Sequence, residues 1–266
     1  MTEVKSYNDL LSIISEAKVC GRCRYTNFFP NRVLHDDWID KKTLFYRKQG
    51  DVLFLVHKKS VFTELFYQTG SMIELTEVLP EMTSLISGPI IVELISKNHN
   101  SNEALGNYPL YNVLRRMTRI GKPILRCICS DIVFADESDK DELQCIFNSE
   151  FDLMAERVPE ESELKKMLLS KSIILCKKDN RIVGFAAYDL NSLSIHLRYW
   201  WVDESYRGQG IGGDLLAFFF RVGKDTRRQY LWVFEDNENA IKRYIHYGFE
   251  FDGMSDHIFI LNKTIE

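Results

Sequence analysis

The sequence lacks the features that would place a protein in a membrane, outside the cell or in a repetitive assembly. No apolar run reaches the length of a membrane span, and the first residues, Met-Thr-Glu-Val-Lys-Ser, lack the charged and apolar regions of a signal peptide. There are only six prolines and no low-complexity stretch, whereas 45% of the residues are hydrophobic. That content is ample for a packed core. We therefore expect a folded cytoplasmic protein with no membrane partner, built as one large domain or two ordinary ones.

No histidine lies close in the sequence to either pair of cysteines, so none could complete a metal site with them locally. Cys20-x-x-Cys23 could form half of a zinc site with Cys127 and Cys129, or a redox pair by itself. However, Cys127 and Cys129 fall in an alternating, strand-like stretch, where cysteine serves as a small apolar residue. We expect reduced thiols and no metal. The six cysteines are Cys20, Cys23, Cys127, Cys129, Cys145 and Cys176.

The net charge of −4 is unevenly distributed along the chain. Residues 1–130 carry 17 Lys and Arg against 13 Asp and Glu (+4), and residues 131–266 carry 17 against 25 (−8). An acidic second half suits a cationic amine substrate, although an acidic solvated surface explains the charge equally well. Nothing in this balance indicates a nucleic-acid partner.

Glycine is sparse, yet four of the 14 glycines stand at positions 208, 210, 212 and 213. An apolar strand from Ile195 to Val202 precedes them, and a helix-forming run starting at Asp214 follows. Glycines allow several backbone N–H groups to turn toward one point, and a helix start adds unpaired N–H groups and a positive dipole end. This arrangement predicts a diphosphate site.

The same segment fits two diphosphate-binding patterns. Gly208 opens a G-x-G-x-x-G pattern, with Glu235 placed to meet the ribose of a dinucleotide. Arg207 opens an R-x-x-G-x-G pattern, the pyrophosphate loop of the GCN5-related N-acetyltransferases (GNAT). A dinucleotide fold has its glycines directly at the strand end and needs several further βα units. Here four residues separate Val202 from Arg207, and the chain ends 53 residues after Gly213, which favours the second pattern.

A second motif strengthens the resemblance to the GNAT family. After the apolar run 231–234, the residues Asn237, Ala240, Tyr244, Gly248 and Phe249 match the family's N-x-x-A-x-x-x-Y-x-x-x-G-F signature. The resemblance covers about residues 127–266, with the two motifs in the family's order. It implies a mixed, mostly antiparallel central sheet flanked by helices, the α/β (α+β) fold of acyl-CoA N-acyltransferases.

Local patterns in the second half agree with that fold. They predict strands over 125–134, 173–177, 181–190, 194–202 and 231–234, and helices that start near Asp136, Pro159, the glycine loop and Asn237. The order β-α-α-β-β-β-α-β-α-β is the one that the fold requires. Gly121-Lys122-Pro123 is a helix-stop and turn signal, so we expect two domains, 1–122 and 123–266.

The first half repeats part of this order. Its patterns predict strands over 43–48, 51–58, 60–68 and 89–95, and helices over 71–82 and around 111–117. This β-β-β-α-β-α succession favours a degenerate GNAT-like copy, and an accessory α/β domain of unrelated topology is the alternative. Gln68-Thr69-Gly70-Ser71 stands in the place of the glycine loop with one glycine and no arginine. We expect that this loop cannot hold a diphosphate.

The resemblance also implies which residues bind acetyl-CoA, the expected co-substrate. Backbone groups of Trp200, Trp201 and Val202, on a strand that splays from its neighbour, would bind the pantetheine arm and point one N–H at the thioester oxygen. Asn237 would hydrogen-bond the cofactor arm or fix the loop. The diphosphate would lie in a cradle made of Arg207, Gly208, Gln209, Gly210, Ile211, Gly212 and Gly213.

The catalytic residues are less strongly indicated. By resemblance, Tyr244 would protonate the departing thiolate or hold a water near the sulfur. Some relatives carry a glutamate five positions before the asparagine, but that position here is Trp232. The candidates for the general base are therefore His196, Asp203, Glu204 or a chain of waters, and an amine that loses its proton before binding needs none.

The sequence thus predicts an acetyl-CoA-dependent N-acetyltransferase in which a primary amine of a small molecule or peptide attacks the thioester directly. The protein would act as a monomer or homodimer. One alternative is a non-catalytic acyl-CoA-binding or regulatory protein, which the missing glutamate favours. Another is an aminoacyl transferase that uses aminoacyl-tRNA, which the intact loop and the negative charge disfavour.

Overall fold

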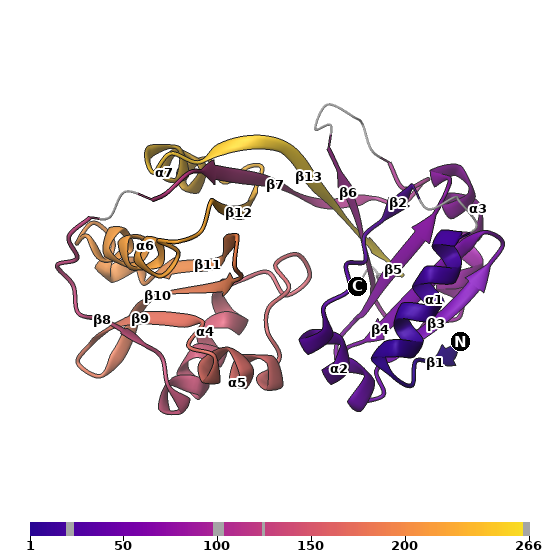
Figure 1. The fold of residues 1–266 in the computed structure, drawn as a ribbon, viewed down its shortest axis with the longest axis horizontal. Helices are drawn as coiled ribbons and strands as arrows, with labels where there is room; N and C mark the ends of the chain where they lie inside the picture. The colour runs from indigo at the N-terminus through magenta and orange to yellow at the C-terminus, as the bar shows by residue number, and fades with distance from the viewer. Residues whose placement is uncertain (20–23, 98–103, 124–125, 263–266) are drawn as a thin grey trace. The chain divides into compact units, whose positions relative to one another are not determined.

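The computed structural model describes residues 1–19, 24–97, 104–123 and 126–262, and the chain forms two compact units (Figure 1). Unit 1 contains Met1–Leu114 and Gly253–Glu266, and unit 2 contains Arg115–Asp252. The division falls inside two strands, β7 (Leu110–Ile120) and β13 (Glu250–Leu261). Each of these strands therefore contributes residues to both units.

Unit 1 is a sheet with the strand order β1-β3-β4-β5-β6-β13. The short strand β2 pairs with the end of β5, at Gln68 and Thr69, beyond the register between β5 and β6. The pairing between β5 and β6 is parallel, and the other registers in this unit are antiparallel. The strands are β1 (Thr2–Glu3), β2 (Tyr25–Thr26), β3 (Leu44–Gln49), β4 (Val52–Lys58), β5 (Thr63–Thr69) and β6 (Ile90–Ser96). The helices are α1 (Tyr7–Val19), α2 (Arg32–Asp40) and α3 (Met72–Ser84).

The sheet of unit 1 is covered on both faces, as the unbroken apolar sequence of β4 requires. Leu53 and Leu55 belong to the core that holds α1 and α2, and Val52, Phe54 and Val56 belong to the core that holds α3. Side chains alternate along a strand, so successive residues of β4 pack on opposite faces. The helix α3 begins at the predicted place because Ser71 caps it and accepts a hydrogen bond from the Glu74 N–H.

Unit 2 has the strand order β7-β12-β11-β10-β9-β8, in which β11 and β12 are parallel and the registers of β8 to β11 are antiparallel. Its further strands are β8 (Ile132–Phe134), β9 (Ile173–Lys178), β10 (Arg181–Leu190), β11 (Ser194–Val202) and β12 (Arg228–Phe234). Its α-helices are α4 (Lys140–Glu150), α5 (Glu161–Leu169), α6 (Ile211–Val222) and α7 (Glu238–His246). Short 3-10 helices η1 (Glu137–Asp139) and η2 (Glu204–Tyr206) precede α4 and the glycine loop.

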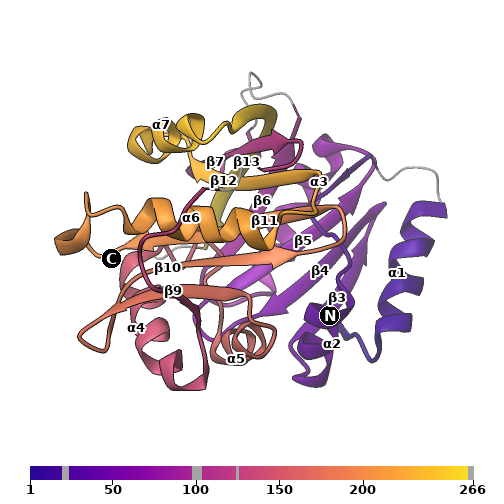
Figure 2. The same ribbon diagram turned by 60° about the vertical axis from the view of Figure 1, so that its left-hand side comes forward.

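The helices of unit 2 also cover both faces of its sheet (Figure 2). On one face Leu143 of α4 and Leu164 of α5 pack with Phe185 and Tyr199. On the other face the apolar residues of α6 and α7, among them Leu215 and Tyr244, share a core with Leu197. The strand β11 therefore contributes alternate side chains to each core, and the glycine loop at its end leads directly into α6.

The element order predicted for the second half is confirmed, and so are the strands and the first helix predicted between residues 43 and 95. The helix predicted around 111–117 is wrong, because these residues form β7. Partners on neighbouring strands stabilise it: the Arg115 guanidinium lies 3.8 Å from the Phe251 ring centroid, and Arg116 Nε donates to Asp252 at 2.8 Å. Local helical spacing was outweighed by these contacts.

The strand predicted over 125–134 is shorter in the structure, where β8 covers Ile132–Phe134. Leu125 lies outside the described residues, and residues 126–131 are irregular. Here the N–H groups of Cys129 and Ser130 donate to the Asp214 carboxylate at 3.2 and 2.7 Å, so they are not available to a strand ladder. Among the described helices, none is long and apolar enough to cross a membrane.

Candidate active site

The two parallel strands of unit 2 separate in the middle of the sheet. The register between β11 and β12 runs from Ser194 opposite Arg228 to Leu197 opposite Leu231 and ends there. At the next residue β11 carries a bulge: Tyr188 pairs with Leu197 and Ala187 with Tyr199, which leaves Arg198 as the extra residue. A bulge bends its strand and increases the local twist, so the end of β11 diverges from β12.

The divergence leaves the last residues of β11 paired on one side. Trp200, Trp201 and Val202 keep their register with β10, but no register with β12 is found beyond Leu197 among the described residues. Their backbone groups that face β12 can therefore bind a ligand. The two indoles point to opposite faces: Trp200 Nε1 donates to Gly212 O at 3.1 Å, and Trp201 Nε1 donates to Glu150 Oε2 at 3.0 Å.

The glycine loop begins α6 without a side-chain cap. Gly208 and Gly210 have φ values of +82° and +87°, a left-handed conformation that disfavours a side chain. No atom lies within 4 Å of the place of a Cβ on either residue, so the space above them is open. Gly210 is the N-cap of α6 and forms no side-chain cap hydrogen bond. The first N–H groups of the helix thus remain available to an anion.

The other loop residues predicted to bind the diphosphate differ in how they are held. Arg207 is half-exposed and its Nε donates to Val202 O at 3.2 Å, while the Gln209 amide donates to Ser205 O at 3.4 Å. Ile211 is buried in the core. A Cβ on Gly212 would lie 3.2 Å from the Trp200 ring, and one on Gly213 would lie 3.0 Å from the Tyr247 hydroxyl. These two glycines let α6 approach its neighbours closely.

The residues of the second motif lie on α7. The Asn237 side chain caps this helix by accepting from the Ala240 N–H at 3.1 Å. Tyr244 is buried, with its ring centroid 5.5 Å from that of Trp200. Among the described residues, no group hydrogen-bonds the Tyr244 hydroxyl. Burial, together with the negative charge of Glu156, raises the pKa of Tyr244 well above its ordinary value, so this hydroxyl keeps its proton at neutral pH.

His196 lies before the bulge, in the part of β11 that is still paired. It stands opposite Tyr230 and stacks on that ring at 4.4 Å between centroids. Its Nδ1 is 3.6 Å from the Asp189 carboxylate, and burial lowers the pKa of the imidazole. The other two candidates for the base are placed differently: Asp203 caps η2, and the Glu204 side chain is 91% exposed beside Arg207.

Sequence reasoning missed one further residue in unit 2. Glu156 lies in the segment between α4 and α5, is partly buried, and accepts a hydrogen bond from the Asp152 N–H at 2.8 Å. Burial raises the pKa of its carboxyl group to about 7, and the nearby Asp152 charge acts in the same direction. No motif marks it, because this part of the sequence contains many acidic residues and only the fold buries this one.

Unit 1 has the same divergence of two parallel strands, but its own chain fills it. The register between β5 and β6 ends after Glu64 opposite Ile91. There the buried Asn27 amide donates to Leu65 O at 3.3 Å and Glu93 O at 3.1 Å, and its oxygen accepts from the Tyr67 N–H at 2.8 Å. The strand β2 then pairs along β5. Groups that could bind a cofactor arm are therefore used within the unit.

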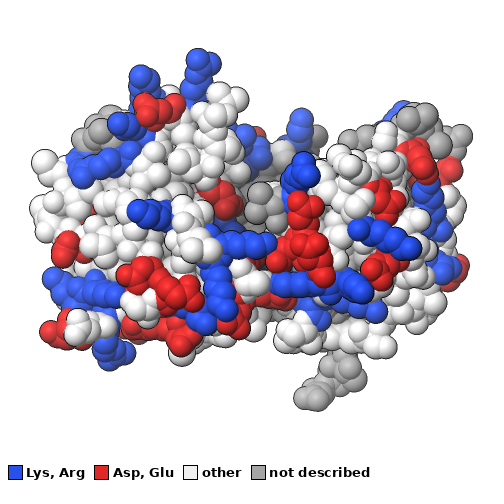
Figure 3. All heavy atoms as spheres, turned by 60° about the horizontal axis from the view of Figure 1, so that its bottom comes forward, with Lys and Arg blue, Asp and Glu red and all other residues white. Residues whose placement is uncertain are grey.

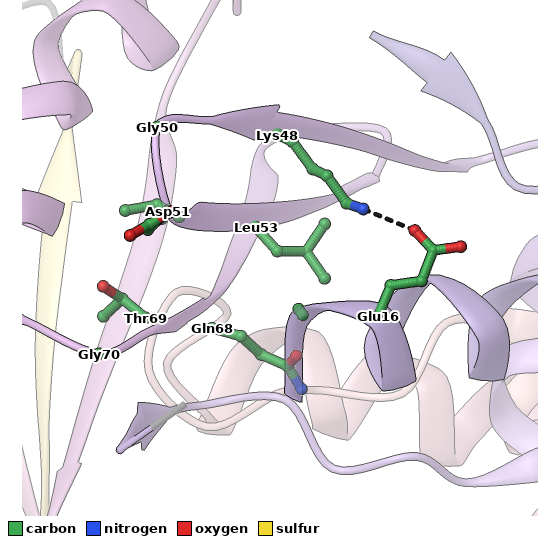
Figure 4. Close-up of a pocket in the computed structure, with 10 residues that line it drawn as sticks. Glu16, Lys48, Gly50, Asp51, Leu53, Gln68, Thr69 and Gly70 are labelled. Carbon is green, nitrogen blue, oxygen red and sulfur yellow. Dashed lines mark hydrogen bonds and ion pairs between the residues drawn. The ribbon is translucent and has the colours of Figure 1, made fainter. Parts of the chain in front are cut away.

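A small cavity lies beside the segment that replaces the glycine loop in unit 1 (Figure 4). Its volume is about 80 Å³, and its lining includes Gln68, Thr69 and Gly70 as well as Glu16 and Lys48, whose side chains form an ion pair at 2.7 Å. Ligand pockets usually measure roughly 300 Å³ or more. The described part of this cavity is too small for a nucleotide.

The described cysteines are separate thiols. Cys127, Cys129 and Cys145 are exposed and Cys176 is buried. The expectation that Cys127 and Cys129 lie on a strand is wrong, because their segment is irregular. Cys20 and Cys23 lie outside the described residues. Within the described ranges, no group of three or more His, Cys, Asp and Glu side chains is arranged to hold a metal ion.

The part of the chain that carries both motifs is similar in sequence to known proteins. Residues 140–249 match the model of the Acetyltransferase (GNAT) family. The spermine/spermidine N(1)-acetyltransferase of Bacillus subtilis strain 168 is 33% identical over 86 residues, which cover 28% of this chain and 57% of that protein. The chain thus matches little more than half the length of this relative. Residues 140–249 are a GNAT acetyltransferase domain.

Solved structures extend the likeness of the fold to the whole chain. A tandem GNAT protein from the clavulanic acid biosynthesis pathway has a TM-score of 0.58 at 9% identity, with 96% of each chain covered. A GNAT-family acetyltransferase from Colwellia psychrerythraea has a TM-score of 0.55 at 15% identity, with 94% of this chain and 97% of that chain covered. The predicted fold class, a GNAT fold with a mixed and mostly antiparallel sheet, is confirmed.

Proposed function

We propose that this protein is an acetyl-CoA-dependent N-acetyltransferase that acts on a primary amine. The active domain would be 123–266, and 1–122 would serve as an accessory, degenerate copy. The observation that carries the proposal is the separation of β11 from β12 directly before an uncapped, glycine-rich helix start. A diphosphate at the helix start and an extended pantetheine arm along the free edge of β11 both suit this geometry.

Each predicted cofactor-binding residue has a role in this proposal. The N–H groups of the loop from Arg207 to Gly213 would bind the diphosphate, and the Arg207 guanidinium would add charge. The free backbone groups of Trp200, Trp201 and Val202 would hold the arm, and one of their N–H groups would stabilise the negative oxygen formed during acyl transfer. Asn237, as the cap of α7, would position that helix and with it Tyr244. Tyr244 would donate a proton to the thiolate.

We propose a cationic amine as the acceptor, and polyamines as the first class to test. Acidic side chains gather with basic ones on the face of unit 2 that carries α4 and α5 (Figure 3). Glu150 and Glu156 lie on this side, near the end of α4 and in the following segment. Residues 131–266 carry 25 Asp and Glu against 17 Lys and Arg, and a net negative charge attracts a cationic substrate. The Bacillus subtilis relative is a spermine/spermidine acetyltransferase, which supports the same class.

Calorimetric titration with acetyl-CoA, followed by a turnover assay with spermidine and spermine, tests the proposal. Wild-type protein should bind acetyl-CoA, and Gly210→Glu should abolish binding because it places a carboxylate at a left-handed position in the anion site. The matched control is Gly88→Glu, which also replaces a left-handed glycine with open space around it, but lies outside the loop. Absence of acetyl-CoA binding by the wild type would overturn the proposal.

A further inference from the structure

We propose that Glu156 is the proton acceptor for the attacking amine. The inference rests on the proposed function and adds to it the base that no motif supplies. Glu156 lies between α4 and α5, in a segment that is fixed to β11 at the point where the strands part.

Hydrogen bonds hold this segment in place. The single proton of the Tyr199 hydroxyl is shared between Glu156 O at 2.9 Å and Arg157 O at 2.6 Å, and Tyr199 is the residue directly after the bulge. Arg157 has a φ of +47°, an uncommon conformation for a residue with a side chain. The segment therefore holds a defined turn against β11, and the Glu156 carboxylate is oriented further by the Asp152 N–H.

The negative charge of the Glu156 carboxylate acts on Tyr244, the residue proposed as the proton donor. Burial and then the charge of Glu156 raise the pKa of Tyr244, so the charge of Glu156 acts on the proposed proton donor. Tyr244 comes from α7 on one face of the sheet, and Glu156 from the segment between α4 and α5, the helices of the other face. The opening between β11 and β12 is where groups from the two faces can meet across a substrate.

The chemistry of Glu156 suits the role. A base works best when its pKa lies near the working pH, and the Glu156 pKa of about 7 meets that condition. Asp152 is the charged group that acts on Glu156, and the charge of Glu156 in turn acts on the neutral Tyr199 and Tyr244. Arg198 and Glu163 also act on Tyr199, and Arg243 acts on Tyr244. His196, by contrast, is stacked on Tyr230 in the paired part of β11.

Protons and electrons balance over the acyl transfer. The amine, which has lost its first proton to solvent, forms the N–C bond, and the electron pair of the carbonyl moves to its oxygen. The Glu156 carboxylate takes one proton from the nitrogen. The C–S bond then breaks, and the sulfur takes the proton of the Tyr244 hydroxyl. The protonated Glu156 finally returns its proton to the Tyr244 oxygen, through water, so that both residues are restored.

Steady-state kinetics of the full chain between pH 5.5 and 9, with acetyl-CoA and spermidine, test the inference. In the wild type, log kcat should rise with a slope of about one below pH 7 and level off above it. Glu156→Gln should lower kcat by roughly 10²-fold or more and remove this slope, with an unchanged Kd for acetyl-CoA by calorimetry. The matched control is Glu160→Gln, a change of the same kind at an exposed position four residues away, which should keep the wild-type profile.

The outcomes distinguish this inference from the proposed function. If the wild type binds and uses acetyl-CoA and Glu156→Gln keeps its rate and its pH profile, Glu156 is not the base and the proposed function stands. The same conclusion holds if His196→Gln, and not Glu156→Gln, removes the slope. If the wild type does not bind acetyl-CoA, both the proposed function and the inference about Glu156 are wrong. Should Glu156→Gln fold poorly, partial recovery of Glu156→Ala activity by added formate is expected, and its absence would contradict the inference.

Discussion

At the scale of single residues, Tyr244 has the surroundings of a proton donor. Its ring is packed between Trp200 and Phe249, with centroid distances of 5.5 and 6.0 Å, while its hydroxyl has no hydrogen-bond partner among the described residues. The thiolate of CoA would be the natural partner during turnover.

Tyr244→Phe removes this hydroxyl and little else. We expect kcat to fall by roughly 10²-fold, the usual contribution of a positioned acid, while the Kd for acetyl-CoA changes less than about threefold. The ring stays in the core, so the melting temperature should remain within a few degrees of the wild type. Stopped-flow or steady-state turnover and calorimetry measure the two quantities. A variant with full kcat would exclude Tyr244 as the donor.

The residues of the loop could be predicted from the sequence, whereas Glu156 could not. Gly208 and Gly210 are informative because glycine tolerates a left-handed φ, and glycines with this conformation at a helix start are typical of anion sites. The proposed role of Glu156 depends on its burial and on the action of its charge on Tyr244, and both arise from tertiary packing. Local sequence carries no information on either. The roles of these residues in binding and catalysis stay predictions.

At the scale of elements, short-range patterns predicted the strands and helices whose apolar residues pack in the cores of the two units. The strands β10 and β11 have the predicted bounds, because turn residues stand at both ends of each apolar run. The prediction for β7 was wrong because its three arginines are stabilised by partners distant in the chain: Arg115 by Phe251, Arg116 by Asp252 and Arg119 by Gln229. Helical spacing alone cannot reveal such partners.

The helix α2 carries a histidine whose protonation should affect stability. His35 is buried against Phe28, with ring centroids 4.6 Å apart, and its Nδ1 accepts a hydrogen bond from the Asn31 N–H at 3.0 Å. Burial, followed by the positive charge of a protonated His57, lowers the His35 pKa to about 4, although Asp36 and Glu64 oppose this. The fold therefore requires the neutral imidazole.

The His35 pKa in the folded protein lies below its unfolded value of 6.5. The stability that depends on the neutral imidazole is therefore present above pH 6.5 and is lost as the pH falls toward 4. From pH 7 to pH 4.5, the wild type should lose roughly 2 kcal/mol more unfolding free energy than His35→Gln, which cannot be protonated. Urea unfolding at the two pH values measures the difference. Equal losses in the two proteins would show that His35 does not control the acid response.

At the scale of the whole molecule, the two units repeat one plan with different outcomes. Each has two helices on one face of a sheet, a third helix after the next three strands, and a parallel strand pair that parts early. In unit 2 the parting strands are followed by the glycine loop. In unit 1 Asn27 bridges the parting strands through three hydrogen bonds, and β2 takes up the edge of β5. The two units therefore differ in the glycine loop, which only unit 2 has, and in Asn27 and β2, which occupy the corresponding place in unit 1.

This difference predicts the stoichiometry of binding. The full chain should bind one molecule of acetyl-CoA, because the backbone groups that would hold a second cofactor arm in unit 1 already have partners, and Gln68-Thr69-Gly70 offers a cavity of only about 80 Å³. Displacing Asn27 would leave buried backbone groups without partners, at a cost of roughly 1–3 kcal/mol for each.

Calorimetric titration with acetyl-CoA, with the protein concentration determined by absorbance, gives the number of binding sites per chain. We expect a value near one for the wild type and no binding for Gly210→Glu, since the loop in unit 2 would supply the single site. Two sites in the wild type, or one site that survives Gly210→Glu, would mean that unit 1 binds the cofactor in spite of Asn27. We also expect Asn27→Ala to keep a single site. This change removes the side chain that bridges β5 and β6, but it does not give unit 1 a glycine-rich helix start that could bind the diphosphate.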